Sequence, residues 1–144
     1  FGFVPVCGTY YVQAYTLNMD VLVLSLVSGL AIDTLLMVNN YRDREQDAVS
    51  GKCTLVVRYG RKFGENMYLG LGIAATLLCL WFVNTGRLTL IEFIWAPCVY
   101  LCMHALTWRK MVKIRSGKGL NRILGETSRN MLFLGILLAV ALAA

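Results

Sequence analysis

Charged residues are scarce in this sequence. Only 15% of its 144 residues are Asp, Glu, Lys or Arg, whereas 58% are hydrophobic and the mean hydropathy is +0.62. Such a balance lies outside the range of soluble globular domains. Four long stretches contain none of these charged residues: 1–19, 66–86, 93–108 and 130–144. The shortage of charge excludes an ordinary soluble domain and predicts a protein of the lipid bilayer.

Histidine and closely paired cysteines are also lacking. The chain has one histidine, His104, and its five cysteines include no Cys-x-x-Cys pair. This pattern predicts neither a disulfide framework nor a zinc site. The sequence opens in an apolar stretch without an initiator methionine. We therefore expect a part of a longer protein rather than a signal peptide at this position.

The apolar stretches have the length of membrane-spanning helices. About 20 apolar residues cross the hydrocarbon core, and the backbone inside lipid must satisfy its own hydrogen bonds. We predict an all-α, polytopic membrane helical bundle with five spans, at roughly residues 1–17, 20–40, 65–84, 88–107 and 127–144. Asp33 lies inside the second span. An ionisable group at that depth is a functional candidate, although a local hydrogen bond or a protonated carboxyl group explains it equally.

The formal net charge of +6 comes from two loops. Six of the fourteen Lys and Arg residues lie in 42–62 and seven lie in 109–129, leaving only Arg87 elsewhere. If the spans alternate, both loops lie on one side, and the positive-inside rule makes loops 41–64 and 108–126 cytoplasmic. The excess charge therefore indicates topology, with some attraction for anionic lipid or pyrophosphate. It does not indicate a nucleic-acid partner.

A polar row begins at the end of the second span. Asn40, Asp43 and Asp47 are spaced i, i+3 and i+7, which stacks their side chains on one face of a helix. Three oxygen-bearing groups in a row can hold a hard cation such as Mg²⁺. Basic residues that could hold an anion beside it follow closely: Lys52, Arg58, Arg61 and Lys62. Spacing alone fits a solvated charged loop between two helices equally well.

The pattern over residues 39–60, Asn-Asn-x-Arg-Asp-x-x-x-Asp-x-x-x-Gly-Lys-x-Thr-Leu-x-Val-Arg-x-Gly, resembles a known motif. It is similar to the second acidic motif of the UbiA superfamily of intramembrane aromatic prenyltransferases, and most similar to the branch that prenylates 1,4-dihydroxy-2-naphthoate in menaquinone synthesis. Residues 8–13, Gly-Thr-Tyr-Tyr-Val-Gln, and residues 119–121, Gly-Leu-Asn, also resemble that branch. The likeness spans nearly the whole chain but corresponds to the second half of such an enzyme.

This resemblance implies a fold and an activity. Residues 1–144 would be the C-terminal part of a single nine-helix prenyltransferase domain, with the N-terminal half and its first acidic motif absent. The enzyme would transfer a polyprenyl group from polyprenyl pyrophosphate to 1,4-dihydroxy-2-naphthoate, with decarboxylation, to give demethylmenaquinone in the bacterial inner membrane. Two alternatives stay open: a sibling enzyme acting on another aromatic acceptor such as 4-hydroxybenzoate, and half of a membrane transporter.

The resemblance also implies residue roles. Asp43 and Asp47 would be catalytic and would bind Mg²⁺ together with Asn40. Substrate-binding roles would fall on six residues: Asn39, Asn40, Lys52, Arg58, Tyr10 and Tyr11. From the residues themselves, Glu45 is expected to be a solvated charge and His104 a packed side chain. The loop around Lys118 is expected to be a topology signal, with a cover over the active-site mouth as the alternative. With only one of the two acidic motifs, the chain alone is expected to be inactive.

Overall fold

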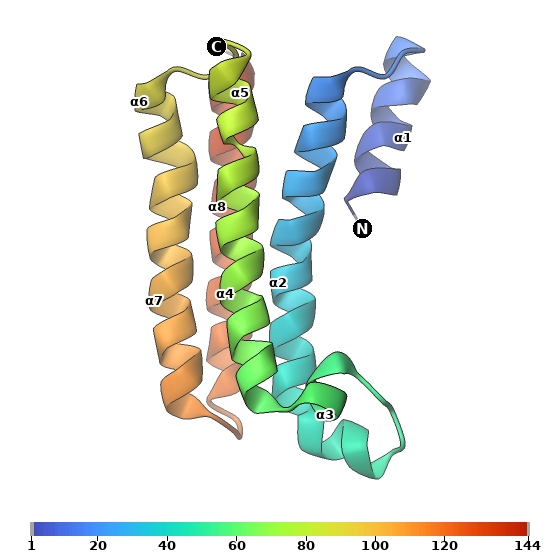
Figure 1. Ribbon diagram of the computed structural model, residues 1–144, viewed down its shortest axis with the longest axis vertical. Helices are drawn as coiled ribbons and strands as arrows, with labels where there is room; N and C mark the ends of the chain where they lie inside the picture. Colours follow the sequence, from blue (N-terminus) through green and yellow to red (C-terminus); the bar gives the residue numbers. More distant parts are fainter. Residues whose placement is uncertain (1, 144) are drawn as a thin grey trace.

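The computed structural model describes residues 2–143, and every regular element in that range is helical. In chain order the elements are α1 (Phe3–Ala14), α2 (Met19–Val49), α3 (Leu55–Tyr59), α4 (Arg61–Leu78), α5 (Leu80–Asn84), α6 (Leu90–Phe93), the π-helical turn η1 (Ile94–Cys98), α7 (Val99–Ile114) and α8 (Leu120–Ala143) (Figure 1). The predicted all-α class is confirmed.

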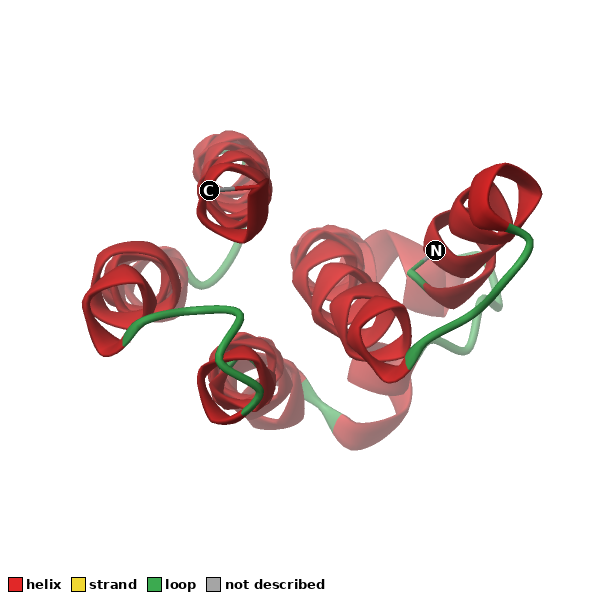
Figure 2. Ribbon diagram, turned by 90° about the horizontal axis from the view of Figure 1, so that it is seen from above, coloured by secondary structure: helices red, strands yellow, loops and turns green. Residues whose placement is uncertain are grey.

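Four long helical columns form the bundle. They are α2, α4 with α5, α6 with η1 and α7, and α8, and each column packs on its two neighbours around the ring. Figures 1 and 2 show α1, which carries the N-terminal end, lying outside this ring beside α2. The π-helical turn contains Pro97. A proline has no N–H to donate, and a wider turn accommodates the missing bond.

The structure gives four candidate membrane spans among residues 2–143, not five. They are Met19–Val49, Arg61–Asn84, Leu90–Ile114 and Leu120–Leu142. The first predicted span, 1–17, contains only the 12 residues of α1 as helix, which is about 18 Å long against a hydrocarbon core of about 30 Å. Tyr15 ends α1 with a left-handed backbone, φ 55°, and Asn18 then caps α2 by accepting from the Val21 N–H at 2.9 Å.

The charged segment 41–64 begins as helix, in agreement with the predicted helical row of Asn40, Asp43 and Asp47. The predicted loop 108–126 is too long, because helix occupies both of its ends. Helix α2 continues through the charged residues to Val49, as far as the Ser50–Gly51 break, and Gly51 has φ +77°. Between α7 and α8 only residues 115–119 are non-helical. Hydropathy marks where a helix leaves the lipid, but Arg, Glu and Gln remain good helix formers in water. The helices therefore extend past their apolar segments at this end of the bundle.

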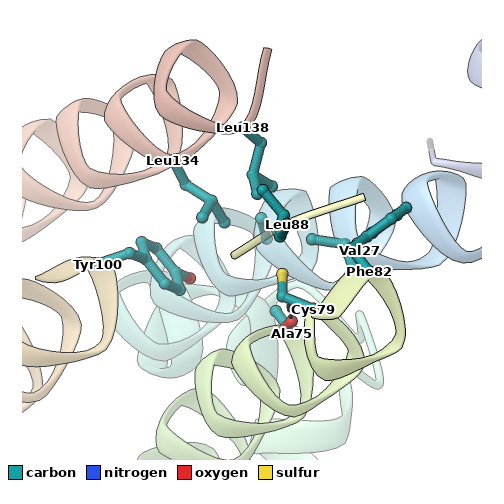
Figure 3. Packing of buried hydrophobic residues seen from close by; sticks show 9 residues of the cluster. Val27, Ala75, Cys79, Phe82, Leu88, Tyr100, Leu134 and Leu138 are labelled. Atoms are coloured by element: carbon teal, nitrogen blue, oxygen red, sulfur yellow. Dashed lines mark hydrogen bonds between the residues drawn. The ribbon is translucent and has the colours of Figure 1, made fainter. Parts of the chain in front are cut away.

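Two apolar clusters form the core. One lies toward the end where α5 meets α6, and Figure 3 shows its side chains converging from α2, α4, α5, α7 and α8. Its buried members are Val27, Ala31, Ala75, Cys79, Phe82, Leu88, Tyr100, Leu134 and Leu138. The second lies toward the other end and contains Met37, Val38, Tyr41, Val56, Tyr68, Met111, Leu120 and Ile123. Burial on this scale fixes the helices that carry the polar row.

Buried hydrogen bonds cross the bundle between these clusters. His104 of α7 is 1% exposed, stacks on Tyr68 with ring centroids 4.3 Å apart, and its Nε2 lies 2.9 Å from the Tyr68 carbonyl oxygen. The Tyr68 hydroxyl lies 2.9 Å from the Thr127 hydroxyl of α8. His104 is therefore a packed side chain, as predicted. These bonds connect α4 with both α7 and α8.

Candidate active site

Arg42 is the hub of the polar groups at the end of α2. Its Nε and Nη2 donate to the two carboxylate oxygens of Asp43, at 2.6 and 2.7 Å. Nη2 also donates to Asn39 Oδ1 at 2.8 Å, and Nη1 donates to Asn121 Oδ1 at 3.2 Å. The guanidinium group thus connects α2 with the first turn of α8.

Arg42 and Asp43 form an ion pair with two hydrogen bonds although they are consecutive residues of a helix. Consecutive residues on a helix project about 100° apart and do not normally face each other. Here Asn39, one turn earlier on α2, and Asn121 of α8 both accept from the guanidinium and hold it over Asp43. The Arg42 and Asp43 side chains remain 29% and 27% exposed. The pair is ordered by its neighbours and still accessible.

A polar cavity of about 290 Å³ opens around this pair, and we call it the polar cavity. It is lined by Arg42, Asp43, Glu45 and Gln46 of α2, by Gly117 and Lys118 of the α7–α8 turn, and by Asn121 of α8. Lys118, which the sequence reading treated as a topology signal, therefore shares a cavity with Asp43. Glu45 also lines the cavity, although its side chain is 75% exposed and 3.5 Å from Arg44, in agreement with a solvated charge.

An ion-pair cluster holds the short loop that closes this cavity. Glu126 of α8 accepts from Lys110 of α7 at 2.8 and 2.9 Å and from Arg122 at 3.2 Å. Only 10% of the Glu126 side chain is exposed. Between these anchor points the chain reverses direction through Arg115, φ 64°, and Gly117, φ 89°. The Glu126 contacts therefore set where Lys118 and Asn121 lie.

A second, apolar cavity lies next along the same two helices. It measures about 430 Å³ and is lined by Ile32, Leu35, Leu36 and Asn39 of α2 and by Leu124 and Ser128 of α8. We call it the apolar cavity. Asn39 lines it and accepts a hydrogen bond from Arg42, which lines the polar cavity. The two cavities are therefore neighbours, with Asn39 and Arg42 at their boundary.

Asp47 lies one helical turn after Asp43 on α2 and is more deeply buried than Asp43. Asp47 is 8% exposed, and its Oδ1 lies 3.5 Å from the Lys52 ammonium nitrogen. The following turn folds back over it, since the Lys52 N–H and the Ser50 hydroxyl donate to the Asp47 backbone carbonyl at 2.9 and 3.1 Å. Its Oδ2 is buried without a protein hydrogen-bond partner. That oxygen is available as a ligand.

The donor set fits part of an Mg²⁺ site. Residues 43 and 47 place two carboxylates about 5–6 Å apart at Cβ on one helix face, and oxygen donors are what Mg²⁺ prefers. The unpartnered, buried Oδ2 of Asp47 supports this fit. Within residues 2–143, however, no three His, Cys, Asp or Glu side chains gather closely enough to hold a metal ion. The chain thus offers two carboxylates and needs further oxygen ligands.

Other predicted site residues lie further away. Asn40 is half-buried on α2 beside this row. Arg58 is exposed on α3, with its guanidinium carbon 5.4 Å from the centre of the Tyr59 ring. It does not line the polar cavity. Its proposed substrate contact stays a prediction.

Tyr10 and Tyr11 lie on α1, at the opposite end of the bundle from Asp43. The Tyr10 hydroxyl accepts from Asn18 at 3.3 Å and lines a cavity that also contains Asp20 and Arg87. Along α2, residues 18 and 43 are about 37 Å apart. The structure does not bring these tyrosines to the acidic row, and their substrate role stays a prediction.

Sequence reasoning did not single out three residues of the polar cavity: Arg42, Lys118 and Asn121. A signal for each of them was present. Arg42 belongs to the Asn-Asn-x-Arg-Asp string, and Asn121 belongs to the Gly-Leu-Asn stretch. The structure joins these two stretches through the Arg42–Asn121 hydrogen bond. For Lys118 the signal was its place between Gly117 and Gly119, but the topology interpretation was preferred there.

Known proteins show the same family assignment. The model of the "UbiA prenyltransferase family" matches residues 1–137. A 1,4-dihydroxy-2-naphthoate octaprenyltransferase of Mycobacterium leprae (strain TN) is 34% identical over 148 aligned positions, covering 99% of this chain and 47% of that protein. The enzyme of the same name from Haemophilus influenzae (strain Rd) is 39% identical over 79 residues, covering 55% and 25%.

The Escherichia coli (strain K12) protein of that name is 36% identical over 84 residues, covering 58% of this chain and 27% of its own length. The chain spans at most about half the length of these curated relatives. No solved structure matches. The family match nevertheless covers nearly the whole sequence, including the three similar stretches at residues 8–13, 39–60 and 119–121. This chain belongs to the UbiA prenyltransferase family.

Proposed function

We propose that the chain is the C-terminal part of an enzyme that transfers a polyprenyl group from polyprenyl pyrophosphate to 1,4-dihydroxy-2-naphthoate, with decarboxylation. Its family membership and the shared printed name of its relatives support this assignment. The product would be demethylmenaquinone, formed as its quinol. The chain length of the prenyl group stays open, because "octaprenyl" describes the relatives.

One structural observation carries the proposal: the polar and apolar cavities adjoin along α2 and α8. A polyprenyl pyrophosphate is an amphiphile with a charged head and a long apolar tail. The polar cavity offers Arg42 and Lys118 to the diphosphate, while Ile32, Leu35 and Leu124 offer apolar surface to the tail. The order of the cavities along α2 matches the order of these two parts.

The proposed reaction breaks one bond and makes another. The C–O bond between the prenyl group and the diphosphate breaks, so that the diphosphate leaves with the electron pair. The electron-rich naphthoate ring then forms a C–C bond to the allylic carbon and loses its carboxylate as CO₂. Arg42, Lys118 and Lys52 would stabilise the departing diphosphate by charge-assisted hydrogen bonds.

We propose that Asp43 and Asp47 hold Mg²⁺ in the complete enzyme. When bound there, Mg²⁺ would neutralise part of the charge that develops on the leaving diphosphate. The two acids supply oxygen ligands from one wall of the site only. We propose that an N-terminal half of the same protein, carrying the first acidic motif, supplies the opposite wall and is the partner of this chain.

We propose that the site faces the cytoplasm of a bacterial cell and that the helices cross its inner membrane. The turn after α2 and the turn after α7 lie at the same end of the bundle (Figure 1). Thirteen of the fourteen Lys and Arg residues belong to 42–62 and 109–129, at or near those turns. The positive-inside rule assigns that end to the cytoplasm.

The acceptor can be tested directly with the full-length protein in nanodiscs. A polyprenyl pyrophosphate would be supplied with either 1,4-dihydroxy-2-naphthoate or 4-hydroxybenzoate, and pyrophosphate release and product mass would be measured with Mg²⁺ or with EDTA. We expect Mg²⁺-dependent release and a decarboxylated naphthol product. Turnover with 4-hydroxybenzoate alone would replace the acceptor assignment, and no pyrophosphate release with either acceptor would favour the transporter alternative.

A further inference from the structure

Each of the two carboxylates proposed to hold metal is already paired with a cation. Arg42 takes both oxygens of Asp43, at 2.6 and 2.7 Å. Lys52 lies 3.5 Å from Asp47 and leaves one oxygen of that carboxylate without a partner. Asp43 therefore differs from Asp47, because both of its oxygens accept hydrogen bonds from a guanidinium group, whose positive charge opposes a metal ion at the same carboxylate.

The guanidinium of Arg42 has little capacity left for another partner. It has five N–H groups, and its hydrogen bonds to Asp43, Asn39 and Asn121 use four of them. One N–H group remains. A diphosphate that binds Arg42 through two parallel hydrogen bonds, the geometry that this side chain favours, must therefore displace one of the present acceptors.

We propose that Arg42 exchanges partners when the prenyl donor binds: the diphosphate replaces Asp43 on the guanidinium, and Asp43 is released to bind the metal ion. This inference rests on the proposed function of the site. Asp43 is the acceptor that leaves, because it alone of the three has another cation to receive it. Arg42 thus keeps Asp43 from the metal until the diphosphate arrives.

The surrounding contacts suit such an exchange. Asn39 and Asn121 hold the guanidinium from α2 and α8 and do not compete for a metal as strongly as a carboxylate does. The guanidinium can therefore stay in place while its partner changes. More than a quarter of each side chain of the Arg42–Asp43 pair is exposed, so a ligand in the polar cavity can reach the pair.

The exchange predicts that metal and diphosphate each strengthen the binding of the other. Without donor, a metal ion must compete with Arg42 for Asp43; without metal, a diphosphate must compete with Asp43 for Arg42. Each ligand therefore removes the competitor of the other. Coupling between two ligands is reciprocal and typically amounts to 5- to 150-fold in affinity.

The test measures the two ligands separately on the full-length protein in nanodiscs. Mn²⁺ binding would be followed by its EPR signal without diphosphate, and inorganic pyrophosphate binding would be followed by calorimetry without metal. We expect Arg42→Gln to bind Mn²⁺ about fivefold more tightly and pyrophosphate about tenfold more weakly. Asp43→Asn should show the reverse, with tighter binding of metal-free pyrophosphate and weaker binding of Mn²⁺.

Matched controls measure the general effect of changing a charge. Arg44 is two residues along the same helix, pairs with exposed Glu45 at 3.5 Å, and does not line the polar cavity. For Asp43, the control is Asp20, which pairs with Arg87 at 3.2 Å and lines a different cavity. Arg44→Gln and Asp20→Asn carry the same charge changes as Arg42→Gln and Asp43→Asn. If each control shifts both affinities as much as its counterpart, the exchange is overturned. Weaker binding of both ligands by Arg42→Gln would also overturn it.

These titrations separate the exchange from the proposed reaction. An enzyme that prenylates a different acceptor can still show the opposite shifts in Mn²⁺ and pyrophosphate affinity. Conversely, a wild-type protein that prenylates 1,4-dihydroxy-2-naphthoate while Arg42→Gln behaves like Arg44→Gln retains the function and refutes the exchange.

Discussion

At the scale of single residues, two acids of one helix face meet different partners. Asp43 lies in an open cavity under a guanidinium fork, whereas Asp47 lies almost buried under the turn that follows α2. A carboxylate that is buried with an unpartnered oxygen is costly to retain. Its presence at Asp47 is therefore better explained by a ligand of the working enzyme than by stability.

We expect Asp43→Asn and Asp47→Asn each to lower kcat/KM at least about 100-fold in the full-length enzyme, because an amide keeps the shape but loses affinity for the metal. Membrane insertion should be unchanged. Glu45→Gln is the internal comparison, since its carboxylate is 75% exposed, and its effect should stay within about threefold. Equal losses in all three variants would indicate general damage to α2.

Lys52 provides a test on the donor side. Its ammonium group lies 3.5 Å from Asp47, so it can contact a diphosphate that is held by the acidic row. We expect Lys52→Ala to raise the KM for polyprenyl pyrophosphate about tenfold, equivalent to about 1.4 kcal/mol, with little change in the KM for the acceptor. Lys62→Ala, an exposed lysine of α4, should be close to neutral. A defect confined to the acceptor KM would contradict the role of Lys52.

At the scale of elements, close approach between α4 and α7 depends on one glycine. Gly72 faces the ring of His104, and a methyl group built on Gly72 would overlap that ring. His104 cannot retreat easily, because it stacks on Tyr68 and hydrogen-bonds to the α4 backbone. The absence of a side chain at this position allows the hydrogen bonds that connect α4, α7 and α8.

We expect Gly72→Ala to destabilise the protein by about 1–3 kcal/mol through overpacking, measured as a lower thermal unfolding midpoint in detergent. Gly70→Ala is a matched control on the same helix, because a methyl group there meets no atom within 4 Å. Alanine also has the higher helix propensity, so Gly70→Ala should be neutral or slightly stabilising. A similar loss for both variants would rule out the clash with His104.

The elements show what the sequence could predict. Uncharged runs located the four helical columns, and the spacing of Asn40, Asp43 and Asp47 predicted helix beyond the apolar run, as α2 shows. The short α3 and the helical extension through 108–114 were not predicted, because hydropathy does not distinguish a helix in water from a loop. Motif spacing singled out Asp43, which lines the polar cavity, and Asp47, which does not. Lys118 reaches the polar cavity only through the fold of the α7–α8 turn.

At the scale of the whole molecule, the site is open on one side. Among residues 2–143, the polar cavity is lined by α2, the α7–α8 turn and the start of α8. No further acidic cluster in that range completes a metal site. Large apolar side chains are also exposed along α1 and α8, including Val12, Tyr15, Leu132 and Val140. These surfaces suit contact with lipid or with further helices.

We expect the 144-residue chain to insert in membranes but to show no prenyl transfer by itself, because one wall of the diphosphate site is lacking. Co-expression with the proposed N-terminal half should restore part of the activity, since membrane helices that insert separately can still associate. The measurement is product formation in membranes that contain either piece or both. Substantial transfer by the isolated chain would refute a site built from two acidic motifs.

The length of α2 has a consequence for the lipid around the enzyme. Its 31 residues extend about 46 Å, and Asn39 lies about 30 Å from its first residue, which is close to the thickness of the hydrocarbon core. The length of the helix would therefore place the boundary between the two cavities level with the lipid headgroups. In a bilayer of much shorter acyl chains α2 would tilt, and a bilayer of much longer acyl chains would become thinner around it. Turnover should then fall on either side of an optimal acyl-chain length, while the affinity of the full-length protein for Mg²⁺ should not change.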